Sequence, residues 1–160
     1  GVVGLPLDVA RLPAERAAVV DSLAASVAHA HTQSLTPVVF TSRGERQFAS
    51  AAERLAFGDT VSAALMDVVK RLPPTLGFLI SKGGITSNDV LSTGLALTAS
   101  RVLGQILPGV TVVQTPPDHR LPQIPVVIFP GNVGGDGALA EAYRRLARSH
   151  AQARPAKLAA

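Results

Sequence analysis

Two glycine-rich segments hold the residues of this sequence that are best suited to chemistry. The first, FLISKGGITSNDV, covers residues 78–90, and the second, VVIFPGNVGGDGAL, covers residues 126–139. In each, an apolar stretch with strand character leads into a glycine-rich loop and then into an expected helix. Glycine lets the backbone approach a ligand closely, and unpaired N–H groups at a helix start attract anions. Both segments therefore predict an anion-binding role, for example toward phosphate.

The first loop adds a cation and hydroxyl groups to its glycines. Lys82 would neutralise phosphate charge, while Gly83 and Gly84 would offer backbone donors. Thr86 and Ser87 add hydroxyls, and we expect one of them to cap the following helix. The spacing matches neither the Walker A motif nor the GxGxxG dinucleotide fingerprint, so the loop does not identify a nucleotide fold by itself.

The second loop supplies an amide and a carboxylate. Its amide is that of Asn132, and its glycines are Gly131, Gly134, Gly135 and Gly137. We expect Asp136 to be the N-cap of the last helix, with orientation of a magnesium-bound water as the alternative. Ligands of open α/β sheets bind outside the carboxyl ends of the strands. If the two strands are neighbours, the two loops form opposite walls of one anion site.

The apolar pattern predicts the elements that position these loops. We expect helices over residues 13–31, 60–71, 88–98 and 138–150, with Asp59 as the N-cap of the second. We expect strands over residues 37–42, 76–80, 101–107, 110–114 and 125–129, with a hairpin turn at Pro108-Gly109. Residues 43–57 are either a loop or a short helix. This alternation predicts an α/β fold with a mixed, largely parallel sheet flanked by helices and glycine-rich loops at strand carboxyl ends.

Length and composition limit the class of protein. The 160 residues suffice for one domain, expected over residues 1–150, with a flexible tail over 151–160. The chain begins without Met and as if inside a strand, so we expect a fragment of a longer protein. Hydrophobic residues make up 47% and charged residues 16%, which excludes general disorder. No apolar run reaches the roughly 18 residues of a membrane span, so we expect a cytoplasmic protein.

The charge and the residue types missing from the sequence exclude several functions. The net charge is +4, but the 15 Lys and Arg residues are scattered, many of them beside acids, and aromatic residues total 4%. A basic balance without a stripe or an aromatic platform does not indicate nucleic-acid binding, although it suits a small polyanion. Cysteine is absent, which excludes disulfides and thiolate chemistry. His29 and His31 have no carboxylate cluster beside them, so we expect no metal held by the protein.

Three motifs resemble those of a known family. They are SKGGITSND at residues 81–89, VLGQILPG at residues 102–109 and VIFPGNVG at residues 127–134. In order and spacing they resemble the C-terminal nucleotide-binding domain of the four-carbon acid sugar kinases, once catalogued as a domain of unknown function. The resemblance covers roughly residues 35–148, and the first and third motifs together make it specific.

The resemblance implies ATP-dependent transfer of phosphate to a hydroxyl of a tetronate-type acid, such as threonate, erythronate or a 3-oxo-tetronate. It implies Mg²⁺ carried by ATP and the nucleotide-binding residues Lys82, Gly83, Gly84, Ile85, Thr86, Gly131, Asn132 and Gly134. Family members hold the sugar acid and the base in an N-terminal domain, and the SGS-type strand end that opens their C-terminal domain is missing here. The catalytic residues are therefore unknown, and we expect activity to need that N-terminal domain. The alternative is a non-catalytic module that binds a nucleotide or a partner; a homodimer is left open.

Overall fold

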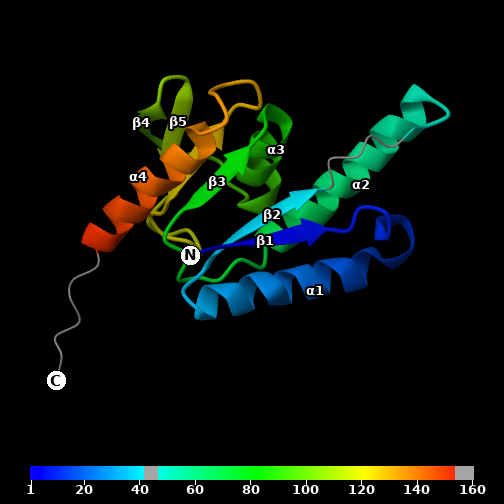
Figure 1. The fold of residues 1–160 in the computed structure, drawn as a ribbon, viewed down its shortest axis with the longest axis horizontal. Coiled ribbons are helices and arrows are strands. Elements are labelled where there is room, and N and C mark those ends of the chain that lie inside the picture. Colours follow the sequence, from blue (N-terminus) through cyan, green and yellow to red (C-terminus); the bar gives the residue numbers. More distant parts are fainter. Residues whose placement is uncertain (42–46, 154–160) are drawn as a thin grey trace. The chain divides into compact units, whose positions relative to one another are not determined.

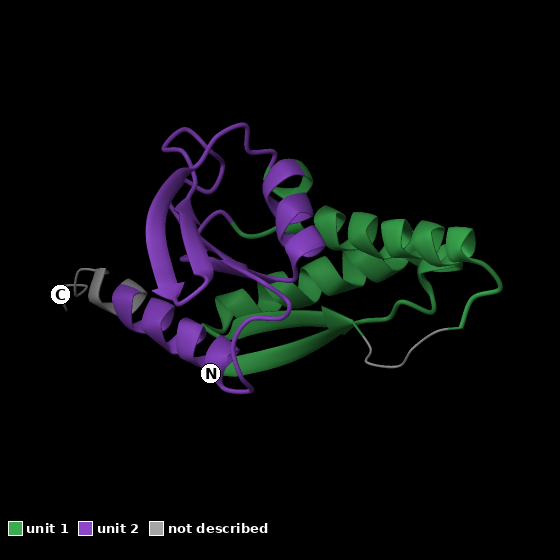
Figure 2. Ribbon diagram, turned by 90° about the horizontal axis from the view of Figure 1, so that it is seen from above, with its two compact units in different colours: residues 1–73, 93–95 green, residues 74–92, 96–160 purple. Residues whose placement is uncertain are grey.

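The structure is a computed structural model that describes residues 1–41 and 47–153. These residues divide into two compact units (Figure 2). Unit 1 comprises residues 1–73 and 93–95, and unit 2 comprises the rest of the described chain from residue 74 onward. Within the described ranges, no helix combines the length and the apolar character needed to cross a membrane.

Unit 1 is a βαβ crossover followed by a second helix (Figure 1). Its elements are β1 (Val2–Leu7), α1 (Leu12–Thr32), β2 (Thr36–Thr41) and α2 (Ala51–Val69). The two strands pair in parallel, from Val2 opposite Thr36 to Leu7 opposite Thr41. Buried residues of both helices and of β1 form its core, among them Leu7, Leu12, Val20, Leu23, Ala64 and Val68. The helix predicted over residues 13–31 is confirmed as α1, and the strand predicted over residues 37–42 is confirmed as β2.

The second helix begins earlier than predicted, and its N-cap is not Asp59. Ser50 is the N-cap, since its hydroxyl accepts a hydrogen bond from the N–H of Glu53 at 3.2 Å. The Glu53 carboxylate in turn accepts from the N–H of Ala49 at 3.1 Å. This reciprocal arrangement satisfies donors that a helix start leaves unpaired, so the helix can begin at Ala51. Asp59 lies inside the helix; of the ambiguous segment 43–57, residues 43–46 lie outside the described chain.

Unit 2 contains a four-stranded mixed sheet with helices (Figure 1). Its elements are β3 (Leu79–Lys82), α3 (Gly84–Asp89), β4 (Arg101–Leu107), β5 (Val110–Gln114), β6 (Pro125–Phe129) and α4 (Ala138–Ala153). The strand order is β3-β6-β5-β4, with a parallel β3–β6 pair and antiparallel β6–β5 and β5–β4 pairs. The core includes Val110, Val127, Phe129, Ala142 and Leu146. The predicted hairpin, last strand and last helix are confirmed.

The α/β class is confirmed, but the expected single, largely parallel sheet is not. The described chain holds two sheets, and β3–β6 is the parallel pair of the larger one. The helix predicted over residues 88–98 is also different. Helix α3 begins at Gly84 and passes at Val90 into a π-helical turn that ends at Gly94. An ideal Cβ at Gly94 would lie 2.7 Å from Val69 Cγ1, so close packing requires glycine there. Of the tail predicted over 151–160, residues 151–153 belong to α4 and the others lie outside the described chain.

Candidate functional site

The candidate site lies where the neighbouring strands β3 and β6 end. Their parallel register runs from Leu79 opposite Val126 to Lys82 opposite Phe129, so both strands end at the same side of the sheet. The N–H of Gly83 donates to the carbonyl of Phe129 at 2.8 Å and extends this pairing into the first loop. The two strands are therefore neighbours, which is the condition for the two loops to face one another. As a result, the segments after Lys82 and after Phe129 start side by side.

Gly83 and Gly131 bring the two backbones together. Gly83 has φ +107°, a conformation that side chains disfavour and glycine adopts freely. An ideal Cβ at Gly131 would lie 3.8 Å from the Cα of Gly83. An ideal Cβ at Gly84 meets no atom within 4 Å, so it would point into open space. A Cβ at Gly84 or Gly131 would therefore occupy this space without overlapping the protein backbone.

Lys82 connects the two loops. Its ammonium group donates to the carbonyl of Gly131 at 3.1 Å and lies 4.9 Å from the centre of the Phe129 ring. An ammonium group has three N–H donors, and one of them is used in this hydrogen bond. The side chain is exposed, so its charge and its other donors face solvent at the edge where the loops begin. Phe129 is buried, and its ring packs against the Lys82 ammonium group in a cation–π contact. The sequence did not indicate this role.

The remaining predicted residues of the first loop lie in α3. Ile85 is 81% exposed, which is unusual for isoleucine and leaves its side chain free to contact a ligand. Thr86 is half-buried, with its hydroxyl 3.4 Å from the position of an ideal Gly83 Cβ. Neither Thr86 nor Ser87 is the expected helix cap, because Gly83 is the N-cap of α3 and both residues lie inside the helix. The hydroxyl of Ser87 has a different role. Ser87 is buried, and its hydroxyl donates to the carbonyl of Ser81 at 3.1 Å and contacts the Ser81 hydroxyl at 3.2 Å, which holds α3 against β3.

The second loop combines exposed groups with one glycine that packing requires. Asn132 is exposed. Gly134 has φ +79°, and an ideal Cβ there would lie 2.4 Å from the Cβ of Ala138. Asp136 is not the N-cap of α4, because the N–H of Glu141 donates to the carbonyl of Gly137 at 3.0 Å and places Gly137 at that position. The Asp136 carboxylate is exposed one residue earlier.

A match to a known protein family shows which family the chain belongs to. The family model described as the nucleotide-binding C-terminal domain matches residues 2–139. The chain belongs to this family. It is the nucleotide-binding C-terminal domain of the DUF1537 proteins, the four-carbon acid sugar kinase family, and the resemblance seen in the three motifs is confirmed.

Solved structures share the fold of this nucleotide-binding domain. A DUF1537 protein from Bordetella bronchiseptica, crystallised with bound citrate as a domain-swapped dimer, superposes with a TM-score of 0.68 at 18% identity over 91% of this chain and 35% of its own. Haemophilus influenzae protein HI1011 superposes with a TM-score of 0.60 at 20% identity over 89% of this chain and 34% of its own. This chain spans about a third of these relatives. No match is found among curated proteins.

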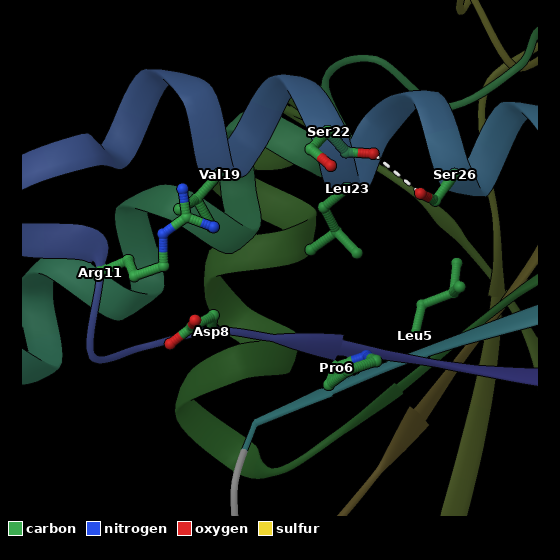
Figure 3. A pocket seen from close by; sticks show the side chains of 8 residues that line it. All are labelled: Leu5, Pro6, Asp8, Arg11, Val19, Ser22, Leu23 and Ser26. Carbon is green, nitrogen blue, oxygen red and sulfur yellow. Dashed lines mark hydrogen bonds between the residues drawn. The ribbon is translucent and has the colours of Figure 1, made fainter.

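Unit 1 of the nucleotide-binding domain has a hollow that the sequence did not signal. It measures about 180 Å³ and lies between β1 and α1 (Figure 3). Asp8 and Arg11 line it at one end, and Ser22 and Ser26 line it from α1. The Ser26 hydroxyl donates to the carbonyl of Ser22 at 2.9 Å, and Arg11 forms an ion pair with Glu15. Among the described residues, no group of three or more His, Asp or Glu side chains is arranged to hold a metal ion.

Proposed function

We propose that this domain binds ATP with its phosphates between residues 83–86 and residues 131–134, and that it is the ATP-binding part of a kinase acting on a four-carbon acid sugar. The observation that carries the proposal is the bridge formed by Lys82. Its ammonium group joins the two loops through Gly131 at the carboxyl edge of the parallel β3–β6 pair. Two glycine-rich backbones and a cation thus converge at the edge where ligands of α/β sheets bind.

The chemistry of phosphoryl transfer suits these groups. Transfer of the terminal phosphate of ATP depends on positioning and on neutralising charge, and demands little covalent chemistry from the protein. The Lys82 ammonium supplies positive charge, and the exposed backbone at Gly84 and Gly131 supplies N–H donors. Mg²⁺ would arrive with ATP as part of the substrate. Asn132 would add a neutral hydrogen-bonding group from the facing loop.

The acceptor half of the reaction is assigned to another part of the protein. The family resemblance implies that an N-terminal domain binds the tetronate or 3-oxo-tetronate and carries the base. We therefore expect this chain to bind ATP without turnover by itself, and to support turnover when combined with that domain. Binding without turnover in the complete protein would instead favour the non-catalytic module.

Calorimetry with ATP and ADP, with and without Mg²⁺, tests the proposed function. We expect saturable binding and a raised melting temperature, because a ligand that binds only the folded state stabilises it. Gly84→Val and Gly131→Val should abolish binding and leave the melting temperature of the free protein close to that of the parent. Gly135→Val is the matched control, since an ideal Cβ at Gly135 also meets no atom within 4 Å and this residue is not in the predicted site.

Two outcomes would contradict the proposal, and a third would remove the glycine variants as support for it. If neither ATP nor ADP gave binding heat or a raised melting temperature, the chain would not bind these nucleotides and the proposed function would be wrong. Parental affinity in both Gly84→Val and Gly131→Val would remove the two loops from the site. An equal loss of affinity in Gly135→Val would show that a bulkier residue disturbs the loop as a whole.

A further inference from the structure

An apolar pocket in unit 2 borders the second loop. It measures about 380 Å³. It is lined by Leu107, Pro108, Val110, Val133, Ala138 and Glu141, together with Gly134. The first three come from the β4–β5 hairpin, the next from the loop after β6, and the last two side chains from α4. Its volume lies in the range of small-molecule sites, and its lining is mostly apolar, as in pockets that accept flat organic rings.

The loop that carries Gly131 also lines this pocket. Val133 and Gly134 line it and belong to the same loop as Gly131, whose carbonyl contacts Lys82. Consecutive Cα atoms are about 3.8 Å apart, so the Cα of Gly131 lies within about 7.6 Å of that of Val133. A nucleotide whose phosphates lie beside Gly131 would therefore have its base within reach of the pocket.

Glu141 is the charged side chain of the pocket lining, and it is held in place. One carboxylate oxygen accepts from Nε of Arg145 at 2.9 Å, and the other accepts from the guanidinium of Arg144 at 3.3 Å. Arg145 also donates to the carbonyl of Ile106 at 2.7 Å, which anchors the pair to the hairpin. The hydrogen bond from Arg145 is the main reason that the pKa of Glu141 is lowered, so the group is ionised at neutral pH. An ionised carboxylate has about four acceptor sites, and these two arginine contacts leave acceptor sites on it for a ligand.

We propose that this pocket receives the adenine base of the nucleotide and that Glu141 accepts a hydrogen bond from the exocyclic amino group. The proposal rests on the proposed function, because the phosphates bring the base to the pocket. Adenine presents an N6 amino donor, whereas the hypoxanthine of ITP carries an oxygen at that place, which the carboxylate would repel. Glu141 thereby selects ATP over ITP, because it accepts a hydrogen bond from the amino group of adenine and repels the oxygen of hypoxanthine.

Calorimetry on the full chain with Mg-ATP, Mg-ITP and inorganic magnesium triphosphate tests this inference. We expect ATP to bind at least tenfold more tightly than triphosphate and about tenfold more tightly than ITP, as for one hydrogen bond to a charged group. In Glu141→Gln the ATP-to-ITP ratio should fall toward one, because the glutamine amide can also donate to hypoxanthine. Ala138→Leu, which fills the pocket, should lower the affinity for ATP to that for triphosphate.

Arg148→Gln is the matched control, since Arg148 is exposed on the same helix and does not line the pocket. It should keep the ATP-to-ITP ratio of the parent, and a circular-dichroism melt of each variant checks the fold. Equal affinities for ATP, ITP and triphosphate, or an unchanged ATP-to-ITP ratio in Glu141→Gln, would overturn the inference while leaving the proposed function in place. No binding of ATP or triphosphate would overturn the proposed function and the inference with it.

Discussion

Replacement of Lys82 by Met separates the charge of this side chain from its packing. Methionine keeps an unbranched stem that can lie on the Phe129 ring, but it loses the ammonium group that donates to Gly131 at 3.1 Å. The fold should tolerate the change, because an exposed cation over an aromatic ring contributes only about 0.5–1 kcal/mol. Lysine at this position therefore matters mainly for what the two loops bind.

The expected loss of nucleotide affinity follows from the exposure of Lys82. Two unit charges 4 Å apart interact by about 1 kcal/mol in water and about 4 kcal/mol near a protein surface. A hydrogen bond to a charged group contributes about 1.5–3 kcal/mol. We therefore expect Lys82→Met to weaken Mg-ATP binding by about 1.5–3 kcal/mol, which is roughly 10- to 150-fold in Kd. Lys82→Arg, which keeps the charge, should lose less.

Calorimetric titration with Mg-ATP at constant ionic strength measures this loss. Lys70→Met is the matched control, because it removes the same charge from an exposed lysine at the C-terminal end of α2, which pairs with Asp67 at 3.4 Å in unit 1. It should bind Mg-ATP within about twofold of the parent, because the charge of Lys70 is solvent-exposed and already pairs with Asp67. If Lys82→Met and Lys70→Met bind Mg-ATP equally well, Lys82 does not contact the phosphates and the reasoning fails.

Three further measurements test the structure of unit 2. Gly134→Ala should lower the free energy of unfolding by about 2–4 kcal/mol in urea denaturation, because it combines φ +79° with a 2.4 Å approach to the Ala138 Cβ; an unchanged midpoint would contradict that geometry. Thr115→Val should cost about 1–3 kcal/mol by the same assay, since the buried hydroxyl accepts from Ile124 N at 3.0 Å and donates to a carbonyl; a neutral effect would mean that water replaces it. The pKa of Glu141 is lowered, mainly by the hydrogen bond from Arg145. The resulting stabilisation is present above about pH 4.3, the ordinary pKa of Glu in the unfolded chain, and is lost as the pH falls through the pKa of the folded state. NMR titration of the Glu141 carboxyl group should give a pKa below that of the unfolded chain.

The parts of the fold that local pattern determines were predictable. The apolar stripe with Pro13 in its first turn predicted α1, and Pro108-Gly109 predicted the turn between β4 and β5. The start of α2 was missed although Ser50 and Glu53 have capping-box spacing, because Asp59 offered an equally acceptable local signal. The division into two sheets was not predictable, since pairing between distant strands depends on tertiary contacts that periodicity does not encode.

The sequence indicated candidate residues for the site but not the contacts that they make. The sequence indicated that the two loops would face one another if their strands were neighbours, and the β3–β6 pairing satisfies that condition. The contact between Lys82 and Gly131 was not predicted. The hydroxyl of Ser87 was misassigned, because sequence does not show which polar side chains become buried against a neighbouring strand. The pocket beside Glu141 depends on three separate segments, so no local motif could signal it.

The most direct test of phosphate binding between the two loops is an amide ¹⁵N–¹H NMR titration of the chain with Mg-ADP. Glycine amides resonate apart from most others, so Gly83, Gly84 and Gly131 can be followed individually. We predict the largest saturable shifts at residues 83–86 and 131–134, and their loss in Gly84→Val. Shifts confined to unit 1, for example around Asp8 and Arg11 of the smaller pocket, would place the nucleotide elsewhere and contradict the account.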